Sequence, residues 1–174
     1  RTIRDLVGLD LRPADEFPMD FSGTSGFSNS ANTLFLQTAH LDRYFTSAEG
    51  VIDEVRADEK AWKKLVGNPR DAATAIIGMM RRAYRRPPTH AEIKEIIARY
   101  ETELGNKMPQ DEALANAFKA ILVSPNFLLR VENSVATAKD QEVSDFDLAT
   151  RLSYFLWAST PDDELLDAAA AGKL

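Results

Sequence analysis

Cysteine is absent from all 174 residues. The chain therefore has no disulfide bond, no thiolate metal site and no attachment point for a covalent c-type haem, which requires the C-x-x-C-H motif. Histidine is scarce as well: His40 and His90 are the two in the chain, and neither has a histidine or glutamate at the i+4 spacing of a helical metal site. We expect no cofactor in this chain.

Long apolar runs and a basic surplus are also missing. No run approaches the roughly 20 residues that a membrane-spanning helix needs, and no signal peptide is visible at the start. The 21 lysines and arginines are outnumbered by 27 aspartates and glutamates, whereas proteins that bind a phosphate backbone usually have a basic surplus. We therefore expect no membrane span and no nucleic-acid partner.

Catalytic motifs are absent too. The chain contains no Ser/His/Asp order, nucleophile elbow, P-loop or dinucleotide fingerprint. Whether it is part of an enzyme stays open, and we expect no catalysis from these residues alone. It begins at Arg1 without methionine and stops just after a predicted helix, which indicates a segment of a longer polypeptide.

The sequence does contain helical periodicity. Apolar residues over 41–55 and 93–104 recur at i, i+3, i+4 and i+7, which predicts amphipathic helices. Period-two alternation is limited to the short stretch 33–36. We predict an all-α multi-helix bundle of about seven to nine helices with one long, ordered N-terminal loop, 9–33, pinned by aromatic side chains.

Helix boundaries can be predicted from capping residues. The T-x-x-E sequence Thr89–Glu92 is a capping box, and Thr2 and Asp5 have the same spacing. The stretch 68–71, NPRD, predicts another start with asparagine as N-cap and proline at the first helical position.

Two apolar stretches are predicted to be buried. The run 117–132 is interrupted by Ser124 and Pro125, which predicts two helical pieces joined at a bend in the centre of the domain. The stretch 146–158 is apolar on almost every side, which is typical of a buried helix.

The N-terminal loop is one candidate site. Its side-chain oxygens allow a calcium site, although the EF-hand pattern is absent. The alternative, which we favour, is that these side chains bond their own backbone in turns. The candidate ligand contacts in this loop are Asp20, Asn29 and Asn32.

An arginine cluster is the second candidate site, and it ends the helix predicted before Pro87. The cluster consists of Arg81, Arg82, Arg85 and Arg86. Arginines bind phosphates and acidic partners. The alternative, which we favour, is structural: cations stabilise a helix C-terminus and pair with acidic helix starts at 145–147 or 162–164.

Three stretches together resemble a known family. RTIRDLVGL at 1–9, with 15–32 and 41–49, resembles its first module. RRAYRRPPT at 81–89 and ILVSPNFLLRVE at 121–132, with 93–100, resemble the second module. The stretch 143–174 resembles the opening of the third. The family is the planctomycete-type cytochrome-associated proteins, which are exported multidomain proteins whose helical domains of unknown function accompany c-type haem domains.

This resemblance implies an organisation and a function. It implies an N-terminal helical module at 1–67, a central module at 68–136 and the start of a third at 143–174, packed on the second as one unit. It also implies a periplasmic, cell-envelope or secreted location, c-type haem elsewhere in the parent protein, and other domains of that polypeptide, haem domains included, as partners.

We therefore expect a non-catalytic helical scaffold or interaction segment of a larger exported c-type cytochrome-like protein, supporting electron transfer or polymer breakdown. The alternative is a ligand- or calcium-binding domain, with or without enzymatic activity, that uses the loop 9–33 and the arginines at 81–86. A third hypothesis is a plain protein-interaction module.

Overall fold

The computed structural model of the chain describes residues 1–17, 38–67, 71–130 and 143–174. Within these ranges it contains nine α-helices, one 3-10 turn and no β-strand, which confirms the all-α prediction. The elements are α1 (Thr2–Val7), η1 (Pro13–Glu16), α2 (Thr38–Ala57), α3 (Glu59–Val66), α4 (Ala72–Tyr84), α5 (His90–Gly105), α6 (Gln110–Leu122), α7 (Pro125–Leu128), α8 (Asp145–Trp157) and α9 (Asp163–Ala170).

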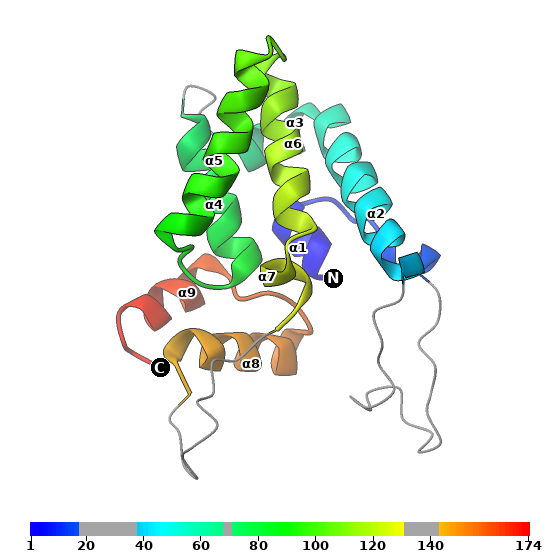
Figure 1. Cartoon of the computed structure of the whole chain (residues 1–174). Coiled ribbons are helices and arrows are strands. Elements are labelled where there is room, and N and C mark those ends of the chain that lie inside the picture. The colour runs from blue at the N-terminus through cyan, green and yellow to red at the C-terminus, as the bar shows by residue number, and fades with distance from the viewer. Residues whose placement is uncertain (18–37, 68–70, 131–142) are drawn as a thin grey trace.

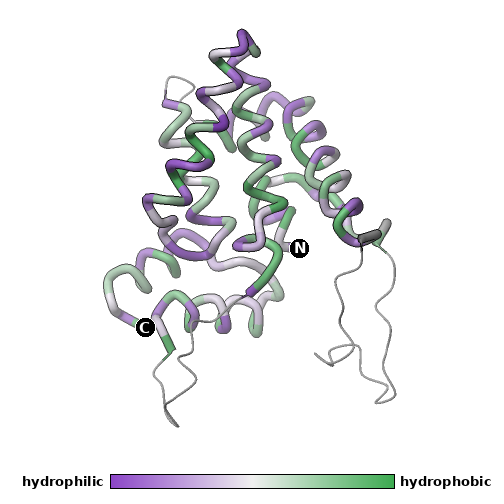
Figure 2. The backbone as a smooth tube through the Cα atoms, in the orientation of Figure 1, coloured by the Kyte–Doolittle hydropathy of each residue, from purple (hydrophilic) through white to green (hydrophobic). Residues whose placement is uncertain are grey.

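Helix α6 lies at the centre of the bundle. It packs against α2, α4 and α5, and α8 lies across the lower end of this upright group with α9 nearby (Figure 1). Phe118 and Ile121 of α6 are fully buried, and the Trp62 ring meets Phe118 edge-on at 5.8 Å. Hydrophobic and hydrophilic residues alternate along the upright helices, as expected for helices with one apolar side (Figure 2).

Several predicted helix ends are confirmed. Thr89 accepts a hydrogen bond from the Glu92 amide, and the Glu92 carboxylate accepts one from the Thr89 amide, which completes the capping box. Ser124 caps α7, and Pro125 is its first residue. The sequence had predicted that both pieces of the run 117–132 are buried. Helix α7, however, is a single turn with no fully buried residue: Phe127 is only partly buried against the core, and Leu129 after it is 49 % exposed. The predicted burial is therefore wrong for the described part of the second piece, residues 124–130.

Two predicted caps are wrong. Helix α4 begins at Ala72, and its N-cap is Asp71, whose carboxylate accepts from the Thr74 amide at 3.0 Å; Asn68 lies outside the described residues. Helix α1 already begins at Thr2 and has no side-chain cap. The Asp5 carboxylate instead accepts a hydrogen bond from a distant hydroxyl, described below.

The burial predicted for the apolar helix α8 is also wrong. Ala149 and Ser153 face the protein and are buried. A row of large side chains faces outward, with 38–86 % of their surface exposed. This α8 apolar row consists of Leu148, Leu152, Phe155 and Leu156. No described helix is both long and apolar enough to cross a membrane.

The beginning of the predicted N-terminal loop is held by an aromatic contact. The Phe17 ring, just after η1, lies 5.0 Å from the Tyr44 ring of α2. This agrees with the prediction that aromatic side chains pin the loop. The rest of the predicted aromatic set lies outside the described residues.

Candidate functional site

The candidate site is the arginine-rich end of α4. The helix ends at Tyr84, and Arg85 follows in the left-handed conformation, with φ 60° and ψ 20°. Glycine or asparagine usually occupies such a position, because other side chains crowd the backbone there. Pro87 and Pro88 then prevent the helix from resuming.

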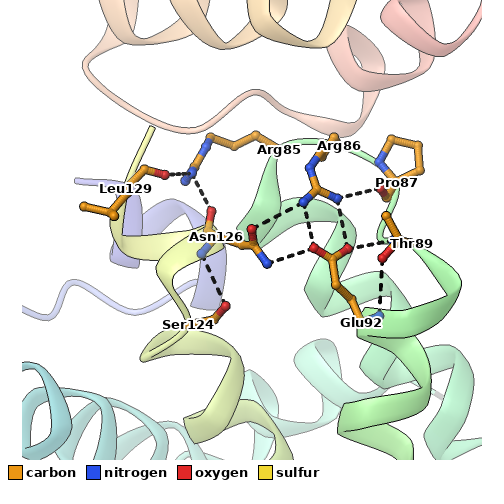
Figure 3. Close-up of polar contacts among 8 residues, drawn as sticks. All are labelled: Arg85, Arg86, Pro87, Thr89, Glu92, Ser124, Asn126 and Leu129. Carbon is orange, nitrogen blue, oxygen red and sulfur yellow. Dashed lines mark hydrogen bonds and ion pairs between the residues drawn. The ribbon is translucent and has the colours of Figure 1, made fainter. Parts of the chain in front are cut away.

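The Arg85 side chain explains why arginine stands at this position. Only 5 % of the residue is exposed, and its guanidinium donates to main-chain carbonyls of the one-turn helix α7 and the residue after it (Figure 3). Nη2 donates to Asn126 and Leu129 at 2.7 and 2.8 Å, and Nη1 donates to Phe127 at 3.1 Å. Arg85 therefore satisfies the carbonyls that a helix end leaves without partners.

Burial lowers the pKa of the Arg85 guanidinium, and the positive charges of Arg130 and Arg86 act in the same direction. A hydrogen bond with the Tyr154 phenol opposes this effect. The Tyr154 ring also forms a cation–π contact with Arg130, whose guanidinium lies 4.5 Å from the ring centroid. Helix α8 thus contributes one aromatic side chain to the support of both cations.

Arg86 forms a bidentate ion pair with Glu92. Its guanidinium binds both carboxylate oxygens of Glu92, with Nη1–Oε2 at 3.0 Å and Nη2–Oε1 at 2.7 Å (Figure 3). The Asn126 amide donates to the same carboxylate at 2.8 Å and accepts from Arg86 at 3.3 Å. The hydrogen bonds from Arg86 lower the pKa of Glu92 to about 2, so the carboxylate is ionised at neutral pH.

The other two arginines point elsewhere. The Arg81 guanidinium contacts α9, at 2.6 Å from the Asp167 carboxylate and 3.7 Å from that of Asp163. The main-chain carbonyl of Arg82 accepts a hydrogen bond from the Thr160 hydroxyl at 3.1 Å. The four arginines therefore do not converge on one ligand.

The predicted loop contacts Asp20, Asn29 and Asn32 lie outside the described residues, so their role as ligand contacts stays a prediction. Among the residues that the structure does describe, no group of three His, Cys, Asp or Glu side chains could hold a metal ion.

A polar cleft of about 540 Å³ borders the arginine junction. Arg86, Asn126 and Arg130 line one part of it, and Ser144 and Thr150 of the α8 region line another. The sequence does not reveal the roles of Asn126 and Tyr154 at this junction. Neither has a local pattern that could have revealed it, because each meets its partners across a long sequence separation.

Chemically, this junction is suited to fixing geometry. The bidentate pair is charged on both sides at neutral pH, and a carboxylate with a pKa near 2 is a poor general base. Arg85 uses its donors on protein carbonyls. The bonds join α4, α5, α7 and α8 at one point.

Comparison with protein families identifies three consecutive segments. Residues 1–57 match the PSD3 family, 71–132 match PSD5 and 143–174 match PSD4, each described as a protein of unknown function (DUF1587, DUF1595 and DUF1592, respectively). These are planctomycete-type domains, which confirms that part of the resemblance. No curated protein and no solved structure matches the chain.

Proposed function

We propose that the chain is a non-catalytic helical scaffold, an interaction segment of a larger exported protein of c-type cytochrome character that supports electron transfer or polymer breakdown. The observation that carries this proposal is the use of the arginine side chains. Arg81, Arg85 and Arg86 each bond to a different helix or loop of the same chain, so their charge serves to hold helices in place.

The α8 apolar row supports an interaction role. Exposed apolar patches on proteins mark interaction surfaces, and Phe155, which belongs to this row, is 86 % exposed. The partner in this proposal is another domain of the same polypeptide, with a haem-bearing domain as the expected neighbour. The exported location and the haem rest on the family resemblance.

One experiment tests the haem part of the proposal. The parent polypeptide is expressed with and without residues 1–174, and its haem absorbance and redox titration are compared. We expect a haem spectrum in both forms and an altered titration or electron-transfer rate when the segment is removed. A parent without a haem spectrum would overturn the cytochrome assignment.

A second experiment tests the interaction part. Hydrogen exchange of α8 is measured in the parent and in the isolated chain, with α5 as the internal reference. We expect protection of α8 to increase in the parent, since a neighbouring domain would cover Phe155 and Leu156. Equal exchange in the two forms would show that the row has no partner there.

A further inference from the structure

A second and larger cleft, of about 890 Å³, lies where the chain's three matched segments meet. Leu6 of the first segment, Arg82 of the second and Trp157 of the third all line it, together with Lys64 at the end of α3. Its volume falls in the range of roughly 300–1,000 Å³ that is typical of small-molecule sites. The scaffold proposal does not use this cleft.

The carboxylates around this cleft are largely engaged. Asp5 is paired with Arg4 at 2.9 Å and accepts a hydrogen bond from the Ser159 hydroxyl at 2.6 Å. Asp162 caps α9 by accepting from the Leu165 amide, at 2.9 Å, and Asp163 lies beside Arg81. The last carboxylate of the lining, that of Glu164, is in the exposed first turn of α9.

Two cations that line the cleft, Arg82 and Lys64, lack the kind of partner that most of these acids have. Neither Arg82 nor Lys64 takes part in an ion pair among the described residues. The Nε of Arg82 is buried and has no hydrogen-bond partner. The Lys64 ammonium reaches toward the end of α1, 3.8 Å from where a Cβ on Gly8 would lie. A buried guanidinium N–H without an acceptor is costly and therefore requires an explanation.

The rest of the lining is suited to an apolar group. Leu6, Leu65, Pro161 and Leu165 contribute aliphatic surface, and Trp157 contributes an indole that is 54 % exposed. A cleft with apolar walls and a few polar groups is the usual arrangement for binding a small molecule, in which the polar groups fix its orientation.

We propose that this cleft binds a small organic carboxylate with an apolar body. The carboxylate accepts hydrogen bonds from Arg82 and pairs with Lys64, and the apolar body lies against Trp157. The ligand supplies the negative charge that the Arg82 guanidinium lacks, since no ion pair to Arg82 is present among the described residues. Because all three segments line the cleft, the ligand also holds them together.

Tryptophan fluorescence gives a direct test, because the chain has two tryptophans and Trp62 packs against Phe118 in the bundle. The intact chain is titrated with hexanoate and, separately, with the uncharged hexanamide. We expect a saturable change in emission with hexanoate and at least tenfold weaker binding of hexanamide. The Trp157→Phe variant should lose the emission change.

Matched variants identify the cations. Lys64→Gln changes an exposed side chain and should leave the fold intact, whereas Arg82→Gln is checked by circular dichroism. Each should weaken hexanoate binding at least tenfold. The control Lys94→Gln, on the exposed side of α5, should leave binding unchanged. No saturable response to hexanoate, equal binding of hexanamide, or wild-type affinity in Lys64→Gln would each overturn the proposal.

Discussion

Replacing Arg85 by methionine tests whether the contact between α4 and α7 depends on the guanidinium. Methionine keeps much of the aliphatic volume but removes the donor from the carbonyls of Asn126, Phe127 and Leu129. A hydrogen bond from a charged donor contributes about 1.5–3 kcal/mol. Water can replace the donor at Leu129, which is 49 % exposed, so the contributions do not simply add. We expect the free energy of unfolding to fall by about 2–4 kcal/mol.

Replacing Arg85 by glycine distinguishes the contribution of the backbone conformation to stability from that of the side chain. Arg85 has a φ of 60°, a conformation that costs non-glycine residues about 1–2 kcal/mol. Glycine adopts it without that cost. Arg85→Gly should therefore be about 1 kcal/mol less destabilising than Arg85→Ala, because both of these variants remove the guanidinium and its buried stem.

Urea unfolding followed by circular dichroism at 222 nm measures the stability of the three Arg85 variants. The matched control is Arg99→Met on α5, where the side chain is 64 % exposed and the expected loss is within about 0.5 kcal/mol. If Arg85→Met is no more destabilising than the control, the guanidinium does not hold α7. If Arg85→Gly is less stable than Arg85→Ala, the backbone argument is wrong.

Three further predictions concern other contacts. The folded pKa of Glu92, about 2, lies below its ordinary 4.5, so its pairing stabilises the fold above pH 4.5 and is lost as the pH falls toward 2. When unfolding is measured across this pH range, the free energy of unfolding of the wild type should fall by about 1–2 kcal/mol more than that of Glu92→Gln, after allowance for screening. In urea unfolding, Phe118→Ala should lower the free energy of unfolding by about 3–5 kcal/mol, and Phe155→Ser should lower it by less than about 0.5 kcal/mol. Equal losses would contradict the finding that Phe118 is buried and Phe155 is exposed. Arg81→Gln should cost about 0–1 kcal/mol, and the cost should shrink in 1 M salt if the contacts with α9 are electrostatic.

Helix ends could be predicted from the sequence where the cap and its partner are close together. The Thr89–Glu92 box and the Ser124 cap each depend on atoms two or three residues apart, so the sequence contains the whole interaction. The NPRD stretch shows the limit of this reasoning. It contains two good N-cap residues, and the choice of Asp71 over Asn68 cannot be read from cap preferences alone, because asparagine and aspartate are equally favourable there.

The roles of the arginines could be predicted only in part. The sequence shows four cations at a helix end, and Arg81 does pair with an acid at the start of α9, as the structural interpretation indicated. It does not show that Arg85 meets carbonyls more than 40 residues away. That contact depends on the bend at Ser124 and Pro125, which turns the α7 carbonyls toward α4.

Burial of α8 could not be predicted from its own composition. An apolar pattern describes the chemistry of one helix, whereas burial depends on what packs against it. Ala149 and Ser153 are small enough to let α8 approach the bundle, and the large side chains remain outside. The same pattern is therefore compatible with a core helix and with an interaction surface.

The third segment differs from the first two in how it is attached. Buried residues of α1 to α6 form one connected apolar core, whereas Ala149, Leu166 and Ala169 are buried outside it. Polar contacts link this segment to the others: Ser159 to Asp5, Thr160 to the Arg82 carbonyl and the α9 acids to Arg81. Such contacts, where partly exposed, contribute little net stability but define orientation. A segment that is oriented in this way can present the α8 apolar row in a fixed direction, as a scaffold requires.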